Sequence, residues 1–216
     1  MSHIAHITAI SPTKRDPRQA TIHVNGKAMV TLPARVINDL DLVVGRAWDE
    51  RLAVAVDGEV LYVKVYRSAM SKLNRRALSR SELEAKLNQL GHDPKTVNRV
   101  LDRLEELSGL NDEQLAHTIV EQALTHRSAG PALLRQKLRK RGIKASTIDT
   151  IVDQYTSPHE LIDRAASLIR DQSRKMAQED SLVRRRRLWN LLARRGFDED
   201  TIEQAFEELK RGHEEA

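Results

Sequence analysis

The sequence predicts a mainly α-helical protein in which three tandem three-helix repeats form an elongated array behind a small β-rich N-terminal domain with one short helix. Two observations carry this prediction. The spacing of apolar residues changes near residue 65, and one pattern of residues then occurs three times. The predicted divisions are residues 1–65 for the β-rich domain and 66–110, 111–156 and 157–216 for helical repeats 1, 2 and 3.

The N-terminal part is rich in Val, Ile and Thr, which favour strands. Short strands are predicted at residues 4–10, 20–24, 28–32, 52–56 and 60–65. Asn25-Gly26 is typical of a two-residue hairpin turn because both positions tolerate positive φ, and Asp57-Gly58 has the same character. Residues 33–40, which begin with proline, are predicted to form the one short helix.

From residue 66 onward, apolar residues recur every three or four positions, which is the period of amphipathic helices. Leading helices are predicted at residues 67–76, 112–126 and 158–176. Ser79 and Glu82 have the spacing of a capping box, in which a serine and a glutamate satisfy the first amides of a helix. Ser157 and Glu160 have the same spacing, with proline in the first turn, and are predicted to cap a later helix.

Three glycines mark an internal repeat, and each follows a helical run where a left-handed residue can end the helix. The repeated segments are LEAKLNQLGHDPKTVNRVLDRL from Leu83, LRQKLRKRGIKASTIDTIVDQY from Leu134 and LWNLLARRGFDEDTIEQAFEEL from Leu188, with Gly91, Gly142 and Gly196 at the same position. A period of about 50 residues is typical of helical repeat proteins. The matching apolar positions are interpreted as core, so they predict fold and not function.

Composition limits the classes of function. Lys and Arg total 36 against 31 Asp and Glu, a net charge of +5, which favours a polyanion or an acidic protein as partner. Aromatic residues make up only 3%, which disfavours a platform for stacking single-stranded bases. The chain has no cysteine, no recognisable signal peptide and no apolar run long enough to span a membrane, so a cytoplasmic protein without a membrane partner is expected.

The patterns that usually carry catalysis are absent from the sequence. It has no phosphate-binding glycine loop, no H-E-x-x-H zinc motif and no G-x-S-x-G nucleophile elbow. Its histidines and paired carboxylates suggest neither a metal site nor an acid–base pair. The prediction is a protein that is not an enzyme, with no catalytic residue, no metal and no cofactor.

Basic residues gather on the second helices of the predicted repeats. Residues 131–144 contain six basic residues and no acidic one, and residues 184–187 are four consecutive arginines. Such clusters suit DNA phosphates or acidic patches on a protein, although any one of these side chains can equally be an ordinary solvated charge. The candidate contact residues are Arg75, Arg76, Arg80, Arg135, Lys137, Arg139, Lys140, Arg141, Lys144, Arg184, Arg185, Arg187, Arg194 and Arg195.

Several segments resemble the RecX family. Residues 79–83 (SRSEL) before Gly91 resemble the first-repeat signature, and residues 110–116 (LNDEQLA) resemble the segment that follows it. Residues 130–143 resemble the second-repeat signature, and residues 24–45 are similar to the strand-rich head of longer members. The resemblance covers nearly the whole chain.

The resemblance implies a regulatory protein that binds the RecA recombinase and its filament on single-stranded DNA. It implies inhibition of filament extension, ATPase, strand exchange and the co-protease activity behind the SOS response, by capping or by groove binding. The chain departs from the family at Leu115, where an aromatic is usual, at residues 118–120 and at the four arginines of residues 184–187. These departures leave the individual contacts open. A monomer is expected, because a repeat array needs no partner to close its core.

Two alternatives stay open from the sequence. Three-helix units resemble helix-turn-helix modules, so the chain could bind single-stranded or double-stranded DNA directly. It could also be a helical-repeat adaptor that binds some other protein.

Overall fold

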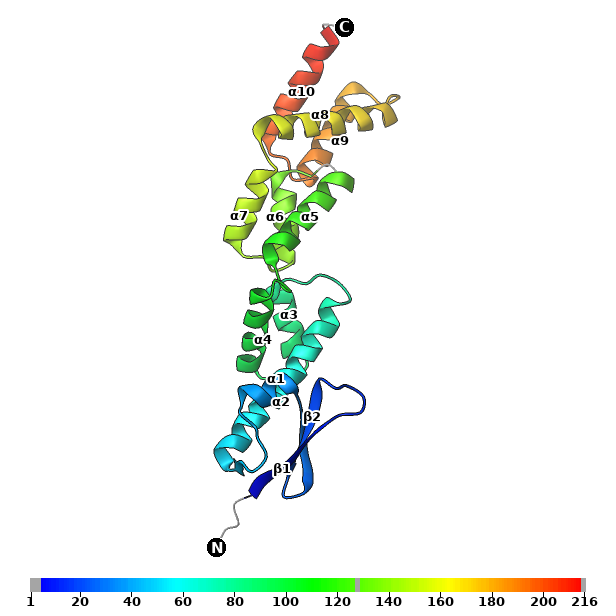
Figure 1. The fold of residues 1–216 in the computed structure, drawn as a ribbon. Coiled ribbons are helices and arrows are strands. Elements are labelled where there is room, and N and C mark those ends of the chain that lie inside the picture. Colours follow the sequence, from blue (N-terminus) through cyan, green and yellow to red (C-terminus); the bar gives the residue numbers. More distant parts are fainter. Residues whose placement is uncertain (1–4, 127–128, 215–216) are drawn as a thin grey trace. The chain divides into compact units, whose positions relative to one another are not determined.

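The computed structural model describes residues 5–126 and 129–214, and Figure 1 shows the order of the helices and strands. The described part of the chain contains four strands near its N-terminus and ten helices. The chain divides into two units, Met1–Ser71 with Leu90–Val100 and Lys72–Gln89 with Leu101–Ala216. The prediction of a mainly helical chain behind a small N-terminal sheet is confirmed.

The first unit contains an antiparallel four-stranded sheet in the order β3-β2-β1-β4. Its strands are β1 (Ala5–Pro12), β2 (Gln19–Val24), β3 (Lys27–Pro33) and β4 (Ala47–Trp48). Asn25 and Gly26 have φ values of 48° and 78° and form the predicted hairpin turn between β2 and β3. Buried Ile7, Ile22 and Leu32 join residues of α1 (Ala34–Asp39) in the core of this unit.

Sequence and structure agree for the start of this unit. The strands predicted at residues 4–10, 20–24 and 28–32 and the helix predicted at residues 33–40 are present, although Ile4 lies outside the described residues. Strand β4 was not predicted, since two residues are too short to show an alternating pattern.

The two strands predicted at residues 52–56 and 60–65 are wrong, and so is the hairpin at Asp57-Gly58. All of these residues lie in one helix, α2 (Glu50–Leu73), of which the leading helix predicted at residues 67–76 is only the end. The alternating valines have the pattern of a strand. However, the side chains that pack in the core of the first unit are Leu52, Val56, Val60 and Val63, which are spaced four or three residues apart, as in a helix. Helical packing on the sheet therefore overrides the local preference of β-branched residues.

The remaining helices recur in the predicted order. They are α3 (Arg80–Asn88), α4 (Pro94–Glu106), α5 (Asp112–His126), α6 (Pro131–Lys140), α7 (Ala145–Gln154), α8 (Pro158–Lys175), α9 (Ser181–Arg194) and α10 (Glu199–Glu214). The repeated leucines are buried at every occurrence: Leu83, Leu87, Leu134, Leu138, Leu188 and Leu192. One hydrophobic cluster joins α5, α6 and α7, and another joins α8, α9 and α10, as expected for three-helix repeats.

Only one of the two predicted capping boxes forms. At the start of α3, the Glu82 amide donates to Ser79 Oγ (3.0 Å) and the Ser79 amide donates to Glu82 Oε2 (3.1 Å). At the start of α8, the Ser157 side chain makes no cap hydrogen bond, so that prediction is wrong. Glu160 instead lies 3.7 Å from Arg164, one turn along the helix.

The turn glycines of the second unit join consecutive repeats. The turn after α9 lies against the start of α6, where the Gly130 amide donates to the Arg195 carbonyl (2.9 Å) and the Ala132 amide donates to the Gly196 carbonyl (3.2 Å). The turn after α6 lies against the start of α3 in the same way, because Ser79 Oγ donates to the Arg141 carbonyl. The end of α9 is thus fastened to the start of α6, and the end of α6 is fastened to the start of α3.

Helix α9 begins earlier than its counterparts. Arg80 and Pro131 start α3 and α6 one turn before Leu83 and Leu134, whereas Ser181 starts α9 two turns before Leu188. Asp180 caps this additional turn by accepting a hydrogen bond from the Leu182 amide (2.9 Å). The extra turn leads directly into the four arginines of residues 184–187.

No helix in the described ranges is both long enough and apolar enough to cross a membrane.

Candidate functional site

A groove of about 720 Å³ lies between α5, α6 and α9, where repeats 2 and 3 meet. We call it the basic groove, because five of the candidate contact residues line it: Lys137, Lys140, Arg141, Arg194 and Arg195. The described residues that line it include no aspartate or glutamate. Ile119, Ala123, Ala129 and Leu133 supply apolar wall, and Gln122 supplies a neutral polar group.

Helix geometry places these cations together. Lys137 and Lys140 are three residues apart on α6, so they share one face of the helix, and Arg141 follows at the turn. Arg194 and Arg195 end α9, and the bond from the Gly130 amide to the Arg195 carbonyl holds that end against the start of α6. Positive charge at both helix C-termini is also favoured by the helix dipoles.

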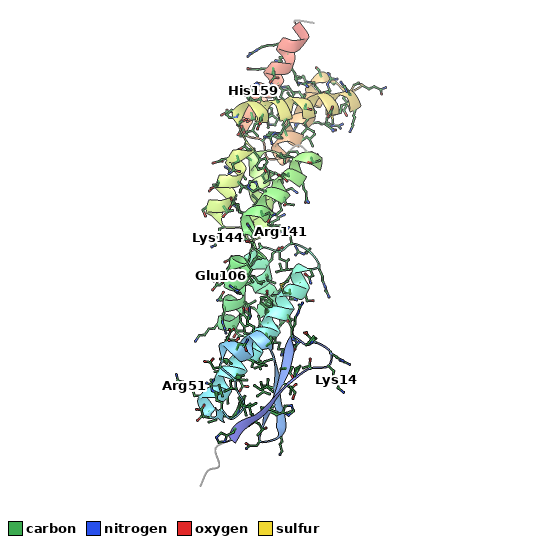
Figure 2. The ribbon with its side chains drawn as sticks, viewed as in Figure 1. Lys14, Arg51, Glu106, Arg141, Lys144 and His159 are labelled. Atoms are coloured by element: carbon green, nitrogen blue, oxygen red, sulfur yellow. The ribbon has the colours of Figure 1, made fainter. Side chains whose placement is uncertain are left out.

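Arg141 lies at the edge of the basic groove but is occupied by a bidentate ion pair. Its Nε donates to Glu82 Oε1 (2.9 Å) and its Nη2 donates to Glu82 Oε2 (3.0 Å) and to the Ala77 carbonyl (2.9 Å). Figure 2 labels Arg141 beside Lys144, at the turn that follows α6. Arg141 therefore fastens repeat 2 to the start of α3, which leaves its guanidinium less available to a partner.

The Glu82 carboxylate is held in its charged form. Burial raises the pKa of Glu82, but hydrogen bonds from Arg141, from the Ser79 amide and from Arg76 outweigh it and bring the pKa below its usual value. A group with a depressed folded-state pKa stabilises the fold above its unfolded pKa, and this contribution is lost as pH falls through the folded pKa. We therefore expect acid to weaken the junction between repeats 1 and 2.

Replacing Glu82 with glutamine is expected to lower the free energy of unfolding by about 1–3 kcal/mol at pH 7, because three cationic or amide donors lose a charged acceptor. The deficit should shrink as pH is lowered through the folded pKa, since wild-type Glu82 then becomes neutral too. Urea denaturation at several pH values measures it. Glu106→Gln is the control, because the exposed pair of Glu106 with Arg103 contributes little. A deficit that is independent of pH would contradict the ionised pair.

Several other candidates are also held by carboxylates. Arg80 contacts Asp102 (2.7 Å) and Glu105 (2.6 Å); burial disfavours its charge, but these two carboxylates outweigh burial and raise the pKa of Arg80. Arg135 contacts Asp149 (3.3 Å) and Asp153 (3.1 Å) on α7. The acidic residues missing from the helix of Arg135 are thus supplied by the next helix.

Three more candidates have partners of different kinds. Arg76 lies 3.3 Å from Glu82, and Arg187 pairs with Glu179. The Arg185 guanidinium lies over the Phe206 ring, 5.1 Å from its centre. These contacts restrain the three side chains, although none of them buries the positive charge completely.

Most of the remaining candidate contact residues have no described ion-pair partner, and they differ in where they lie. Among the side chains that the structure describes, no carboxylate lies at ion-pair distance from Arg75, Lys137, Arg139, Lys140, Lys144, Arg184 or Arg194. Lys137, Lys140 and Arg194 of this set line the basic groove, and we call them the groove cations. Arg184 lines a different groove on α8, α9 and α10. The structure therefore gathers part of the predicted set and disperses the rest.

Sequence reasoning missed two features of this region. Glu82 was recognised as a cap but not as the partner of Arg141, which lies in the next repeat and has no signal in the sequence near it. Gln122 of α5 faces the basic groove, but a lone glutamine on a helix carries no pattern that could have identified it. Among the described residues, no cluster of His, Asp and Glu could hold a metal ion.

The architecture and the helical repeats are shared with known proteins. The model of the RecX first three-helix domain matches residues 66–104, and the model of the RecX second three-helix domain matches residues 111–151. A regulatory protein RecX from Mycobacterium sp. (strain JLS) is 34% identical over 149 residues, which are 64% of this chain and 81% of the relative. The chain belongs to the RecX family. The resemblance predicted from residues 79–83, 110–116 and 130–143 is confirmed.

Relatives and structures extend the similarity beyond the matched repeats. The regulatory protein RecX of Clostridioides difficile (strain 630) is 25% identical over 203 residues, covering 94% of this chain and 95% of that protein. A crystal structure of a regulatory protein RecX shares the fold with a TM-score of 0.82 at 24% identity, over 94% of this chain and all of the other. RecX from Lactobacillus salivarius gives a TM-score of 0.64 at 21% identity, over 69% of this chain and 97% of its own. This chain is thus a RecX-type regulatory protein in both sequence and fold.

Proposed function

We propose that this chain binds the RecA filament on single-stranded DNA and restrains it, lowering filament extension, ATPase, strand exchange and co-protease activity. The basic groove is the observation that carries the proposal. It collects cations from two consecutive repeats, and its described lining residues include no aspartate or glutamate. A nucleoprotein filament presents DNA phosphates and protein carboxylates, either of which would complement such a groove.

The groove cations are the residues proposed to make this contact. Lys137, Lys140 and Arg194 have no carboxylate to displace within the described part of the chain, so binding an anion would cost no existing ion pair. Arg80, Arg135 and Arg141 would each have to leave a carboxylate first. We therefore assign these three a supporting role in the fold.

The test is the ATPase rate of the cognate RecA on single-stranded DNA, titrated with this protein. A large fall at ratios well below one regulator per recombinase is expected, because one molecule at a filament end or in its groove acts on many subunits. Inhibition that needs equimolar protein would point to sequestration of free RecA instead. If the ATPase rate did not change at equimolar protein, with a filament demonstrably present, the proposal would be rejected and direct DNA binding would become the favoured hypothesis.

A further inference from the structure

A second groove, of about 680 Å³, lies on the third repeat between α8, α9 and α10. We call it the third-repeat groove. Its cations come from all three helices: Arg170 and Arg174 from α8, Arg184 and Arg185 from α9, and Lys210 from α10. No carboxylate is found among its described lining residues. It shares no lining residue with the basic groove.

The floor of the third-repeat groove is apolar. Ile169, Leu188, Phe206 and Leu209 line it from the same three helices. Ile169 and Leu188 belong to the core cluster of this repeat, and Phe206 and Leu209 are partly buried against it. The floor is therefore continuous with the packed core of this repeat and presents an apolar surface.

Helical spacing explains the arrangement. Ser181, Arg184, Arg185 and Leu188 are separated by three, one and three residues, so they lie on one face of α9. That face lines the groove, with its two arginines nearer the start of the helix and its leucine one turn further along. The early start of α9 supplies Ser181, which a helix beginning at the repeat position of α6 would not include.

We propose that the third-repeat groove binds an acidic amphipathic helix of a protein partner. Apolar side chains of that helix would lie on Leu188, Phe206 and Leu209, and its carboxylates would pair with the surrounding cations. A floor of apolar side chains bordered by five cations and two serines matches a helix that carries leucine-type and acidic residues together. A purely acidic or a purely apolar helix would satisfy only part of the groove. The proposal does not depend on which protein supplies the helix.

The aromatic residue in the groove argues against a nucleic acid as the occupant. Base stacking on a protein needs a free aromatic face. Phe206 stacks on Trp189 with ring centres 6.4 Å apart and an angle of 7°, and Arg185 covers Phe206 at 5.1 Å. The groove therefore offers bases a single aromatic ring, one face of which Arg185 already occupies, whereas the apolar side chains of a helix need no free aromatic face.

The experiment measures binding of a fluorescein-labelled peptide by anisotropy, with the full chain. The probe has about 16 residues, enough for four helical turns, with leucine at positions i, i+3, i+4 and i+7 and glutamate at most others. Saturable binding to the wild type is expected. Arg174→Glu combined with Arg184→Glu should raise the Kd at least tenfold, and Lys137→Glu with Lys140→Glu, in the other groove, should leave it unchanged.

Two further measurements distinguish the contribution of the apolar floor to binding from that of the cations. A peptide with the leucines replaced by glutamine should bind at least tenfold more weakly, and Leu209→Asp should weaken the leucine peptide by a similar factor with helical content unchanged by circular dichroism. Equal binding of the glutamine peptide, displacement of the leucine peptide by oligo(dT) at equal concentration, or no binding to the wild type would each overturn the proposal.

Discussion

Replacing Lys137, Lys140 and Arg194 together with glutamate is expected to raise the amount of protein needed for half-inhibition of the RecA ATPase by about a hundredfold or more. Each exposed ion pair contributes up to about 1 kcal/mol, and three such contacts correspond to about two orders of magnitude in affinity. Reversing the charge adds repulsion between the groove and an anionic partner. The fold should be unaffected, because no described carboxylate pairs with these side chains.

The matched control is Lys14→Glu with Arg15→Glu and Lys27→Glu. These three exposed residues lie in the N-terminal sheet region, so this variant has the same change in net charge at a different place. It should inhibit nearly as well as the wild type at 0.15 M salt, where charges separated by more than about 8 Å are screened. Equal losses in both variants would mean that net charge, and not the basic groove, determines binding. Full activity of the groove variant would remove the groove from the interface.

Gly196→Ala is expected to lower the free energy of unfolding by about 2–5 kcal/mol. Two costs add. Gly196 has φ of +83°, which costs an alanine about 1–2 kcal/mol. A Cβ there would also lie 2.3 Å from the Leu133 backbone nitrogen, so the junction between repeats 2 and 3 would have to open, at about 1–3 kcal/mol.

The other turn glycines form a graded set of controls. Gly91 has φ of +75° but nothing within 4 Å of an added Cβ, so Gly91→Ala measures the backbone cost alone. Gly142 has φ of +69° and would bring its Cβ to 2.7 Å from Ser81 Cβ, a side-chain atom, so Gly142→Ala should fall between the two. Urea denaturation gives the order. Equal losses at Gly91 and Gly196 would show that turn conformation alone matters and that the close approach of the repeats does not.

Local patterns predicted the helices better than the contacts between them. The spacing of Leu83, Leu134 and Leu188 identified the repeat because core leucines and turn glycines are constrained within each unit. The valines of α2 misled the prediction because alternation within residues 52–65 suits a strand equally well, and only packing against the sheet decides.

The candidate contact residues show the same limit. From the sequence, Arg135 and Lys137 are two cations on one acid-free helix. In the structure Arg135 faces Asp149 and Asp153 of α7, whereas Lys137 faces the basic groove. The choice depends on which side of α6 each residue occupies relative to its neighbours, and a single sequence without its tertiary contacts does not contain that information.

The early start of α9 has a consequence for association between molecules. The starts of α3 and α6 each contact the turn that ends the second helix of the following repeat. Ser79 makes this contact at α3, and Gly130 makes it at α6. At the equivalent place α9 carries its own additional turn, capped by Asp180, so a further turn of this kind would meet helix instead of an open start. We therefore expect the surface that joins repeats within the chain to be closed to a second copy, so that stacking by this geometry would end at the third repeat instead of growing into a fibre.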